Sequence, residues 1–191
     1  MKIVFATGNP NKVREINSIL GDSVEIVGLK DIGCIEDIPE TQPTIQGNAL
    51  QKARYVKENY GYDCFAEDTG LEIDALGGAP GVYTARYAGE AKDANANMAK
   101  ALKELTNKEN RGAQFRTVIA LILNGEEHTF EGIARGTISK EKMGTKGFGY
   151  DPIFVPEGFE RSFAQMEAAE KNVISHRGKA TQLLMSYLHN L

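Results

Sequence analysis

The chain has little cysteine, no tryptophan, no excess of positive charge and no long hydrophobic run. Its two cysteines, Cys34 and Cys64, are too few for a disulfide scaffold, so we expect a reducing, cytoplasmic location. The apolar run near the N-terminus ends at Thr7, so we expect neither a signal peptide nor a membrane span. A net charge of −4 argues against a general binder of nucleic acids or anionic membranes, since both need excess positive charge.

Two common catalytic arrangements are also missing. The three histidines, His128, His176 and His189, share no zinc-ligand spacing with either cysteine. A serine hydrolase is disfavoured because the chain has no Gly-x-Ser-x-Gly motif. What the chain does have is 191 residues, 41% of them hydrophobic, which is enough to bury a core without disulfides. Residues 1–191 therefore leave room for one domain or a two-lobed one, and two large domains are excluded.

Short apolar runs alternate with amphipathic patterns, which is typical of an α/β fold. Strands are expected at 2–6, 24–27, 63–66, 71–75, 114–124, 126–138 and 152–155, and helices at 10–20, 46–59, 93–105 and 175–189. Asn124-Gly125 joins two β-branched runs, which predicts a long antiparallel hairpin. The sequence thus predicts a mixed central sheet with flanking helices.

A polar turn, Thr7 to Lys12, lies between the first strand and the first helix. Backbone N–H groups and the positive end of the helix dipole converge at such a turn, which suits a phosphate. Gly8 permits close approach of the backbone, Thr7 and Asn9 offer hydrogen bonds, and Lys12 adds a charge. A well-capped helix with an exposed lysine explains the same residues.

Adjacent carboxylates, Glu67 and Asp68, end an apolar strand. Because side chains alternate along a strand, we expect only one of the two to face a cleft. A carboxylate there binds Mg²⁺ or accepts a proton from water, although a turn-forming Asp is the alternative. Glu40 and Lys52 add one acid and one cation, and Asn48 shares a helix face with Lys52; a solvated helix face explains these almost as well.

The C-terminal third combines a glycine-rich loop, 147–151, with the polar run 171–179. Aromatic rings in the loop can stack on a flat ring. Asp151 can accept N–H groups, and Lys171, His176 and Arg177 can donate to carbonyls or phosphates. The pattern suits a nucleobase pocket, but the loop aromatics could instead plug the core, and Ser175 could simply cap the last helix.

Together these segments resemble the inosine triphosphate pyrophosphatase family, which hydrolyses non-standard purine nucleoside triphosphates to monophosphate and pyrophosphate. The resemblance is carried, nearly end to end, by Thr7-Gly8-Asn9 with Lys12, Pro39-Glu40-Thr41, Asn48-Ala49 with Lys52-Ala53, Ala66 to Leu71, Gly77 to Gly89, Gly147 to Phe154 and Ser175-His176-Arg177. This chain has Glu67 and Thr69 where bacterial members usually have Asp and Ser, and Ile45 where an aromatic is common.

The resemblance implies two lobes around a nucleotide cleft, a homodimer, and a role for each matching residue. Asp68 would bind Mg²⁺ and act as general base on water, with Glu40 as a second metal contact. The phosphates would be held by Thr7, Gly8, Asn9, Lys12, Lys52 and Thr69. The base and sugar would be held by Phe148, Gly149, Tyr150, Asp151, Lys171, His176 and Arg177, with Phe148 stacking on the base. The roles of Glu67 and Arg86 stay open.

Two other functions fit parts of the pattern. A pyrophosphatase for modified pyrimidine nucleotides would share the phosphate turn and the acids but have a different base pocket. A non-catalytic nucleotide sensor would keep the phosphate turn without turnover. The sequence leaves open the preference among ITP, dITP and XTP, the number of metal ions and the means of rejecting guanine.

Overall fold

The computed structural model describes residues 2–191 and contains a six-stranded sheet with the strand order β2-β1-β3-β4-β5-β6. The strands are β1 (Lys2–Phe5), β2 (Glu25–Gly28), β3 (Cys64–Ile73), β4 (Gly112–Leu123), β5 (Glu126–Ile138) and β6 (Phe154–Pro156). β1 pairs in parallel with β2 and β3, whereas β5 and β6 pair antiparallel. The predicted α/β fold with a mixed sheet is confirmed.

The helices are α1 (Pro10–Leu20), α2 (Ile45–Tyr60), α3 (Ala94–Glu104), α4 (Ala168–Ile174) and α5 (His176–His189). All but α4 match a predicted helix to within one or two residues. α4 escapes prediction because it has 7 residues and its N-cap, Glu167, makes no side-chain cap bond. No helix among residues 2–191 is long and apolar enough to cross a membrane.

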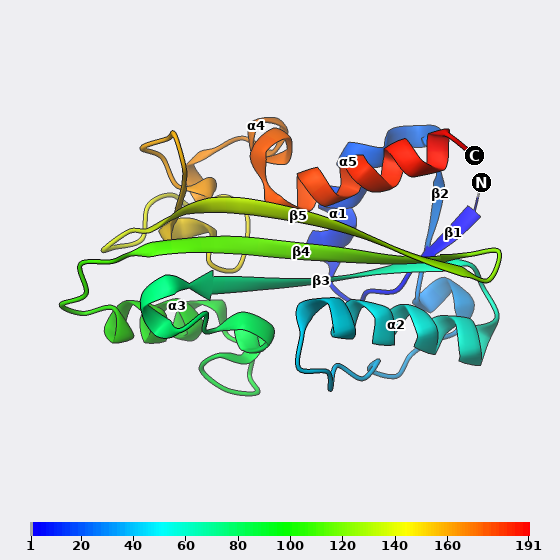
Figure 1. Cartoon of the computed structure of the whole chain (residues 1–191), viewed down its shortest axis with the longest axis horizontal. Helices are drawn as coiled ribbons and strands as arrows, with labels where there is room; N and C mark the ends of the chain where they lie inside the picture. The colour runs from blue at the N-terminus through cyan, green and yellow to red at the C-terminus, as the bar shows by residue number, and fades with distance from the viewer. Residues whose placement is uncertain (1) are drawn as a thin grey trace. The chain divides into compact units, whose positions relative to one another are not determined.

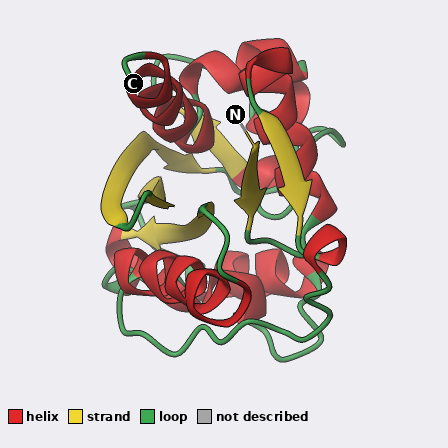
Figure 2. Cartoon of the chain, turned by 90° about the vertical axis from the view of Figure 1, so that its right-hand side faces the viewer, coloured by secondary structure: helices red, strands yellow, loops and turns green. Residues whose placement is uncertain are grey.

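The chain divides into two compact units, each with a hydrophobic core of its own. Unit 1 consists of Met1–Asp68, Thr117–Gly132 and Arg177–Leu191, and unit 2 consists of Thr69–Arg116 and Ile133–His176. In unit 1, α2 covers one face of the strands and α1 and α5 cover the other (Figure 1). Figure 2 shows the same layering, with the strands between helices. Stacked Phe5 and Phe65, with ring centroids 4.5 Å apart, belong to the core of unit 1.

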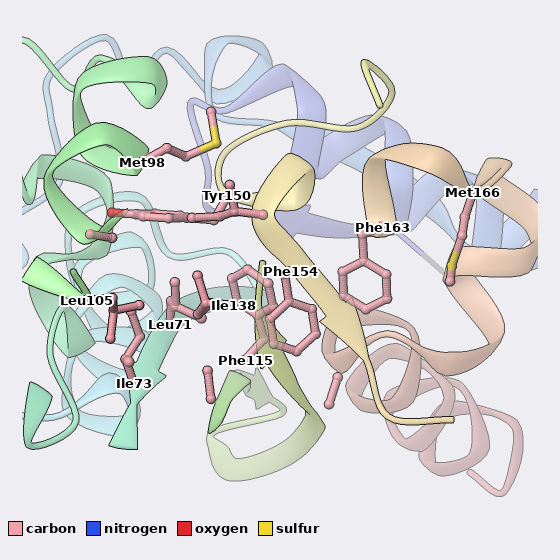
Figure 3. Packing of buried hydrophobic residues seen from close by; sticks show 14 residues of the cluster. Leu71, Ile73, Met98, Leu105, Phe115, Ile138, Tyr150, Phe154, Phe163 and Met166 are labelled. Carbon is pink, nitrogen blue, oxygen red and sulfur yellow. The ribbon is translucent and has the colours of Figure 1, made fainter. Parts of the chain in front are cut away.

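The core of unit 2 is rich in aromatic side chains (Figure 3). The Phe154 ring lies 4.6 Å from that of Phe115 and 5.1 Å from that of Phe163. Tyr150 packs in the same core, and its hydroxyl donates to the Thr84 carbonyl at 2.7 Å. This core therefore fixes the glycine-rich loop that contains Tyr150 to the body of unit 2.

Three local predictions can be compared with the structure. The Asn124-Gly125 turn is confirmed, because both residues have positive φ, 53° and 85°, as a tight hairpin turn requires. The predicted break at Glu67–Gly70 is wrong, because β3 runs unbroken through it; pairing within the sheet overrides the turn-forming residues. Leu183, expected on the buried face of the last helix, is 49% exposed, because the buried stripe follows Ala180, Leu184 and Leu188.

Candidate active site

The turn between β1 and α1 is built as the sequence predicts. Asn9 caps α1, with its Oδ1 accepting from the Asn11 N–H at 2.9 Å, and Pro10 is the first helical residue. The Thr7 Oγ1 accepts from the Asn9 N–H at 3.1 Å, which tightens the turn. Apart from Gly8 and its two chain neighbours, no described residue would lie within 4 Å of a Cβ added at Gly8, so the Cα of Gly8 faces open space.

Glu67 is a fully buried carboxylate that joins α1 to α5. Lys12 Nζ lies 2.7 Å from its Oε1, and Arg177 Nε lies 2.7 Å from its Oε2. Arg177 Nη1 also binds Glu15 on α1. Burial alone would raise the pKa of Glu67, but the charges of Arg177 and Lys12 outweigh burial and hold that pKa well below its usual range. Glu67 is therefore ionised at any physiological pH.

Asp68 points to the other face of β3, as strand alternation predicts, and meets α2. Lys52 Nζ contacts Asp68 Oδ1 at 3.4 Å, Glu40 Oε1 at 2.7 Å and the Glu67 carbonyl at 2.7 Å. Burial opposes the charge of Lys52, but the attraction of Asp68 and Glu40 prevails and raises its pKa. Burial raises the pKa of Asp68, and Lys52 and Lys12 only partly offset this effect.

We call these charged residues of unit 1 the unit 1 cluster: Lys12, Glu15, Glu40, Lys52, Glu67, Asp68 and Arg177. Four carboxylates face three cations, so the cluster alone does not attract a polyanion. Two carboxylates, those of Glu40 and Asp68, share the ammonium group of Lys52. Residues 2–191 contain no group of three or more His, Cys, Asp or Glu side chains able to hold a metal. This donor set suits Mg²⁺, which typically takes one or two protein carboxylates and fills its shell with water and phosphate oxygens.

The glycine-rich loop and α4 form a second group in unit 2. Lys171 Nζ lies 2.7 Å from Asp151 Oδ2 and 5.1 Å from the centroid of the Phe148 ring. The Phe148 N–H donates to the same carboxylate oxygen at 3.0 Å. Gly147 has φ +71°, and a Cβ there would lie 2.0 Å from Asp151 Oδ2, so only glycine permits this contact. Phe148 is half-buried, with Gly149 beside it.

His176 stacks on Phe115, with ring centroids 4.4 Å apart and an interplanar angle of 18°. The Phe163 ring lies near both His176 and Lys171, with its centroid 6.1 Å from that of His176 and 5.7 Å from Lys171 Nζ. We call His176, Phe148, Asp151 and Lys171 the unit 2 cluster. His176 belongs to unit 2 and its neighbour Arg177 to unit 1. The side chains of these two consecutive residues, which the sequence analysis treated as one base-binding group, thus take different partners: His176 stacks on Phe115, and Arg177 binds Glu67 and Glu15.

The structure sorts the predicted site residues between the two clusters. Glu40, Lys12, Lys52 and Asp68 converge in the unit 1 cluster, and Arg177 reaches it through Glu67. Sequence reasoning missed Glu15. Its signal is helical spacing, because Glu15 lies three residues after Lys12 on α1 and therefore projects from the same side of the helix. Thr69 is half-buried on β3 and begins unit 2.

A cavity of about 370 Å³ in unit 1 lies away from these residues. Lys57 and Asp63, which form an ion pair at 2.9 Å, contribute to its wall. None of the residues of the unit 1 cluster is among its lining residues, which are Lys2, Val4, Val27, Asp31, Ile32, Lys57, Gly61, Tyr62 and Asp63.

Comparison with known proteins gives the same assignment as the motifs. The Ham1 family model matches residues 3–187. A dITP/XTP pyrophosphatase from Flavobacterium johnsoniae is 59% identical over 188 residues, covering 98% of each chain. A dITP/XTP pyrophosphatase from Bacillus subtilis is 45% identical over 97% of this chain and 96% of its own length. The HAM1 protein from Coxiella burnetii has a TM-score of 0.92 at 36% identity, and the match covers 100% of both chains.

The fold and the site define the chain as an α/β protein with a mixed sheet whose buried carboxylates pair with lysines. Within that class the chain belongs to the Ham1 family. The resemblance predicted from the sequence motifs is confirmed.

Proposed function

We propose that this protein hydrolyses non-standard purine nucleoside triphosphates, ITP, dITP and XTP, to the nucleoside monophosphate and pyrophosphate. The observation that carries the proposal is the convergence of Glu40 and Asp68 on the Lys52 ammonium group in the unit 1 cluster. The names of the Flavobacterium johnsoniae and Bacillus subtilis relatives support the same substrates. In the proposal residues 1–191 act as one two-lobed domain that removes aberrant nucleotides from the precursor pool of the cytoplasm.

The turn at the start of α1 is proposed to bind phosphate. Its donors are the hydroxyl of Thr7, the amide of Asn9, backbone N–H groups and the Lys12 ammonium group, all at the positive end of the helix. Lys52 and Thr69 are proposed to bind the remaining phosphate oxygens. The transfer needs positioned phosphates and neutralised charge more than a covalent nucleophile, and this set supplies both.

Glu40 and Asp68 are the residues that would hold Mg²⁺. The bound ion would supply charge neutralisation and a more acidic water molecule. It would also reverse the sign of the local charge, since the four carboxylates of the cluster outnumber its three cations. Asp68 would then accept the proton from the attacking water.

The unit 2 cluster is proposed to bind the base. Phe148 would stack on the ring, while Gly149 and Tyr150 shape the loop and Asp151 orders its backbone through the Phe148 N–H. Lys171 and His176 would donate to the 6-oxo group, which inosine and xanthosine have and adenine lacks. A contact of Arg177 with the base stays a prediction, since its guanidinium binds Glu67 and Glu15.

The test is the value of kcat/KM across a panel of nucleotides, with Mg²⁺ varied. We expect ITP, dITP and XTP to exceed ATP and GTP by orders of magnitude, with no turnover in EDTA. Similar kcat/KM values for all purine nucleotides would refute the proposal. A preference for modified pyrimidine nucleotides would favour a pyrophosphatase specific for them. Binding of nucleotide without turnover would indicate a non-catalytic sensor. The homodimer that the resemblance implies stays a prediction, which light scattering would check.

A variant pair separates catalysis from folding. We expect Asp68→Asn to lower kcat by about 10²–10⁴-fold, which is the usual contribution of a general base. Its Tm should change little, because asparagine keeps the shape of the side chain and Lys52 keeps its 2.7 Å contact with Glu40. Asp63→Asn is the matched control. Asp63 lies directly before β3, the strand that carries Asp68, and it pairs with Lys57. Loss of folding in Asp68→Asn would show that this acid is structural.

A further inference from the structure

The segment that carries Glu40 is fastened to α2 by side chains that have no part in the proposed reaction. Gln51 makes two hydrogen bonds to Thr41, the residue directly after Glu40. Its Oε1 accepts from the Thr41 N–H at 2.8 Å, and its Nε2 donates to the Thr41 Oγ1 at 2.8 Å. Because one bond is accepted and the other donated, the amide fixes both the backbone and the side chain of Thr41.

A second attachment of the segment to α2 lies one turn earlier on the same helix. The buried Asn48 Oδ1 accepts from the Gln42 N–H at 2.8 Å. A Cβ at Gly47 would lie 2.9 Å from the Gln42 Cβ, so glycine lets the segment lie directly against the first turns of α2. Thr41 and Gln42 are therefore held to α2 through consecutive backbone N–H groups.

Lys52 follows Gln51 on the same rigid helix. The residues that hold the segment and the ammonium group that contacts Glu40 therefore keep a fixed spacing. The Glu40 side chain is 41% exposed, so packing alone does not hold it in place. Without the Gln51 contacts, the backbone beside Glu40 would have to be ordered when the metal binds, and this loss of conformational entropy would weaken metal binding.

We propose that Gln51 is a positioning residue for the metal site: through Thr41 it holds the Glu40 carboxylate where it meets Lys52 and, together with Asp68, would bind Mg²⁺. This inference rests on the proposed function, because it needs Glu40 to be a metal contact. Partners that orient metal ligands typically affect metal affinity by about 10–100-fold. Gln51 holds only one of the two carboxylates, so we expect an effect near the lower limit.

The test measures metal binding without turnover. Mn²⁺ affinity is determined by electron paramagnetic resonance in the presence of an ITP analogue with a methylene bridge between the α and β phosphorus atoms. The variants are Gln51→Leu, Glu40→Gln, the double variant, and Thr41→Ser, which keeps both partners of Gln51. We expect Gln51→Leu to weaken Mn²⁺ binding about tenfold with little change in Tm, and Thr41→Ser to match the wild type.

The double variant distinguishes positioning from a general structural role. If Gln51 acts through Glu40, Gln51→Leu changes Mn²⁺ affinity less than twofold when Glu40 is already Gln. Amide exchange of residues 37–43 should quicken in Gln51→Leu and stay slow in Thr41→Ser. If Gln51→Leu fails to fold, Thr41→Val, which removes only the acceptor of Nε2, carries the same comparison.

Several results would overturn the inference. The first is wild-type Mn²⁺ affinity in Gln51→Leu, or in Thr41→Val if that variant replaces it. The second is a loss of Mn²⁺ affinity on Gln51→Leu that is just as large when Glu40 is already Gln. Wild-type affinity in Glu40→Gln would also overturn it, while leaving the pyrophosphatase activity standing. By contrast, absence of ITP hydrolysis by the wild-type protein would defeat the proposed function itself.

Discussion

Glu67→Gln is the substitution whose energetic consequence the structure specifies most closely. The carboxylate is fully buried and contacts two cations, Arg177 and Lys12. Glutamine keeps the shape of the side chain, but its NH₂ group opposes an N–H donor. The Arg177 guanidinium, 3% exposed, loses its fully buried charge partner and keeps Glu15. Breaking such a buried pair typically costs about 3–5 kcal/mol. At about 2–4 °C per kcal/mol for a chain of this size, Tm should fall by roughly 6–20 °C.

Glu127→Gln provides the matched control. Glu127 also binds an arginine through two hydrogen bonds, both of 2.7 Å to Arg54, but the pair is 39% and 50% exposed. Exposed ion pairs contribute about 0.2–1 kcal/mol to the free energy of unfolding, because solvent screens the charges and the long side chains lose entropy. The same chemistry should therefore give a large effect at Glu67 and a small one at Glu127.

Urea unfolding followed by far-UV circular dichroism measures both variants. The pH dependence gives a second check. The folded-state pKa of Glu67 lies far below its unfolded value of about 4.3, so the ionised carboxylate stabilises the fold above that pH. The gap between wild type and Glu67→Gln should therefore be full at pH 7 and shrink as the pH falls below about 4. A loss at pH 7 no larger than that of Glu127→Gln would refute the reasoning.

Three further predictions test other parts of the molecule. Gly8→Ala should fold normally, since the added Cβ meets open space. Its kcat/KM for ITP should fall at least tenfold, because the methyl group blocks the approach of phosphate to this backbone. Unchanged kinetics would exclude that approach. Phe148→Leu should raise KM for ITP about five- to thirty-fold, since stacking on a base is worth about 1–2 kcal/mol; an unchanged KM would exclude stacking. Glu36 accepts hydrogen bonds from the hydroxyls of Tyr55 and Tyr60, and these bonds, chiefly that of Tyr60, lower its pKa to about 2. The difference in free energy of unfolding between wild type and Glu36→Gln, measured in urea, should therefore be present above about pH 4.3 and vanish toward pH 2. A difference that does not depend on pH would exclude this coupling.

The local elements could be predicted because short-range chemistry determines them. Asn9 and Pro10 mark the start of α1, and Asn124-Gly125 forces a tight hairpin. Lys52 falls in the apolar stripe of α2, but the sequence left a solvated helix face as an alternative. Its burial against Glu40 and Asp68 is a finding of the structure.

The partners within the site could not be predicted, because they depend on contacts between distant parts of the chain. Glu15 and Arg177 are 162 positions apart, and no local pattern links them. The continuity of β3 through Glu67 and Asp68 depends on its neighbours in the sheet, which override the turn preference of Asp-Thr-Gly. The partners of His176, which stacks on Phe115, and of Arg177, which binds Glu67 and Glu15, likewise come from distant parts of the chain.

The most direct test of the central claim is the identity of the products formed from ITP. Ion-exchange chromatography after limited turnover, with pyrophosphate and orthophosphate measured separately, shows which bond is broken. Attack at the α-phosphorus predicts equimolar inosine monophosphate and pyrophosphate, without inosine diphosphate at any time. Inosine diphosphate and orthophosphate would place the attack at the terminal phosphate and contradict the account.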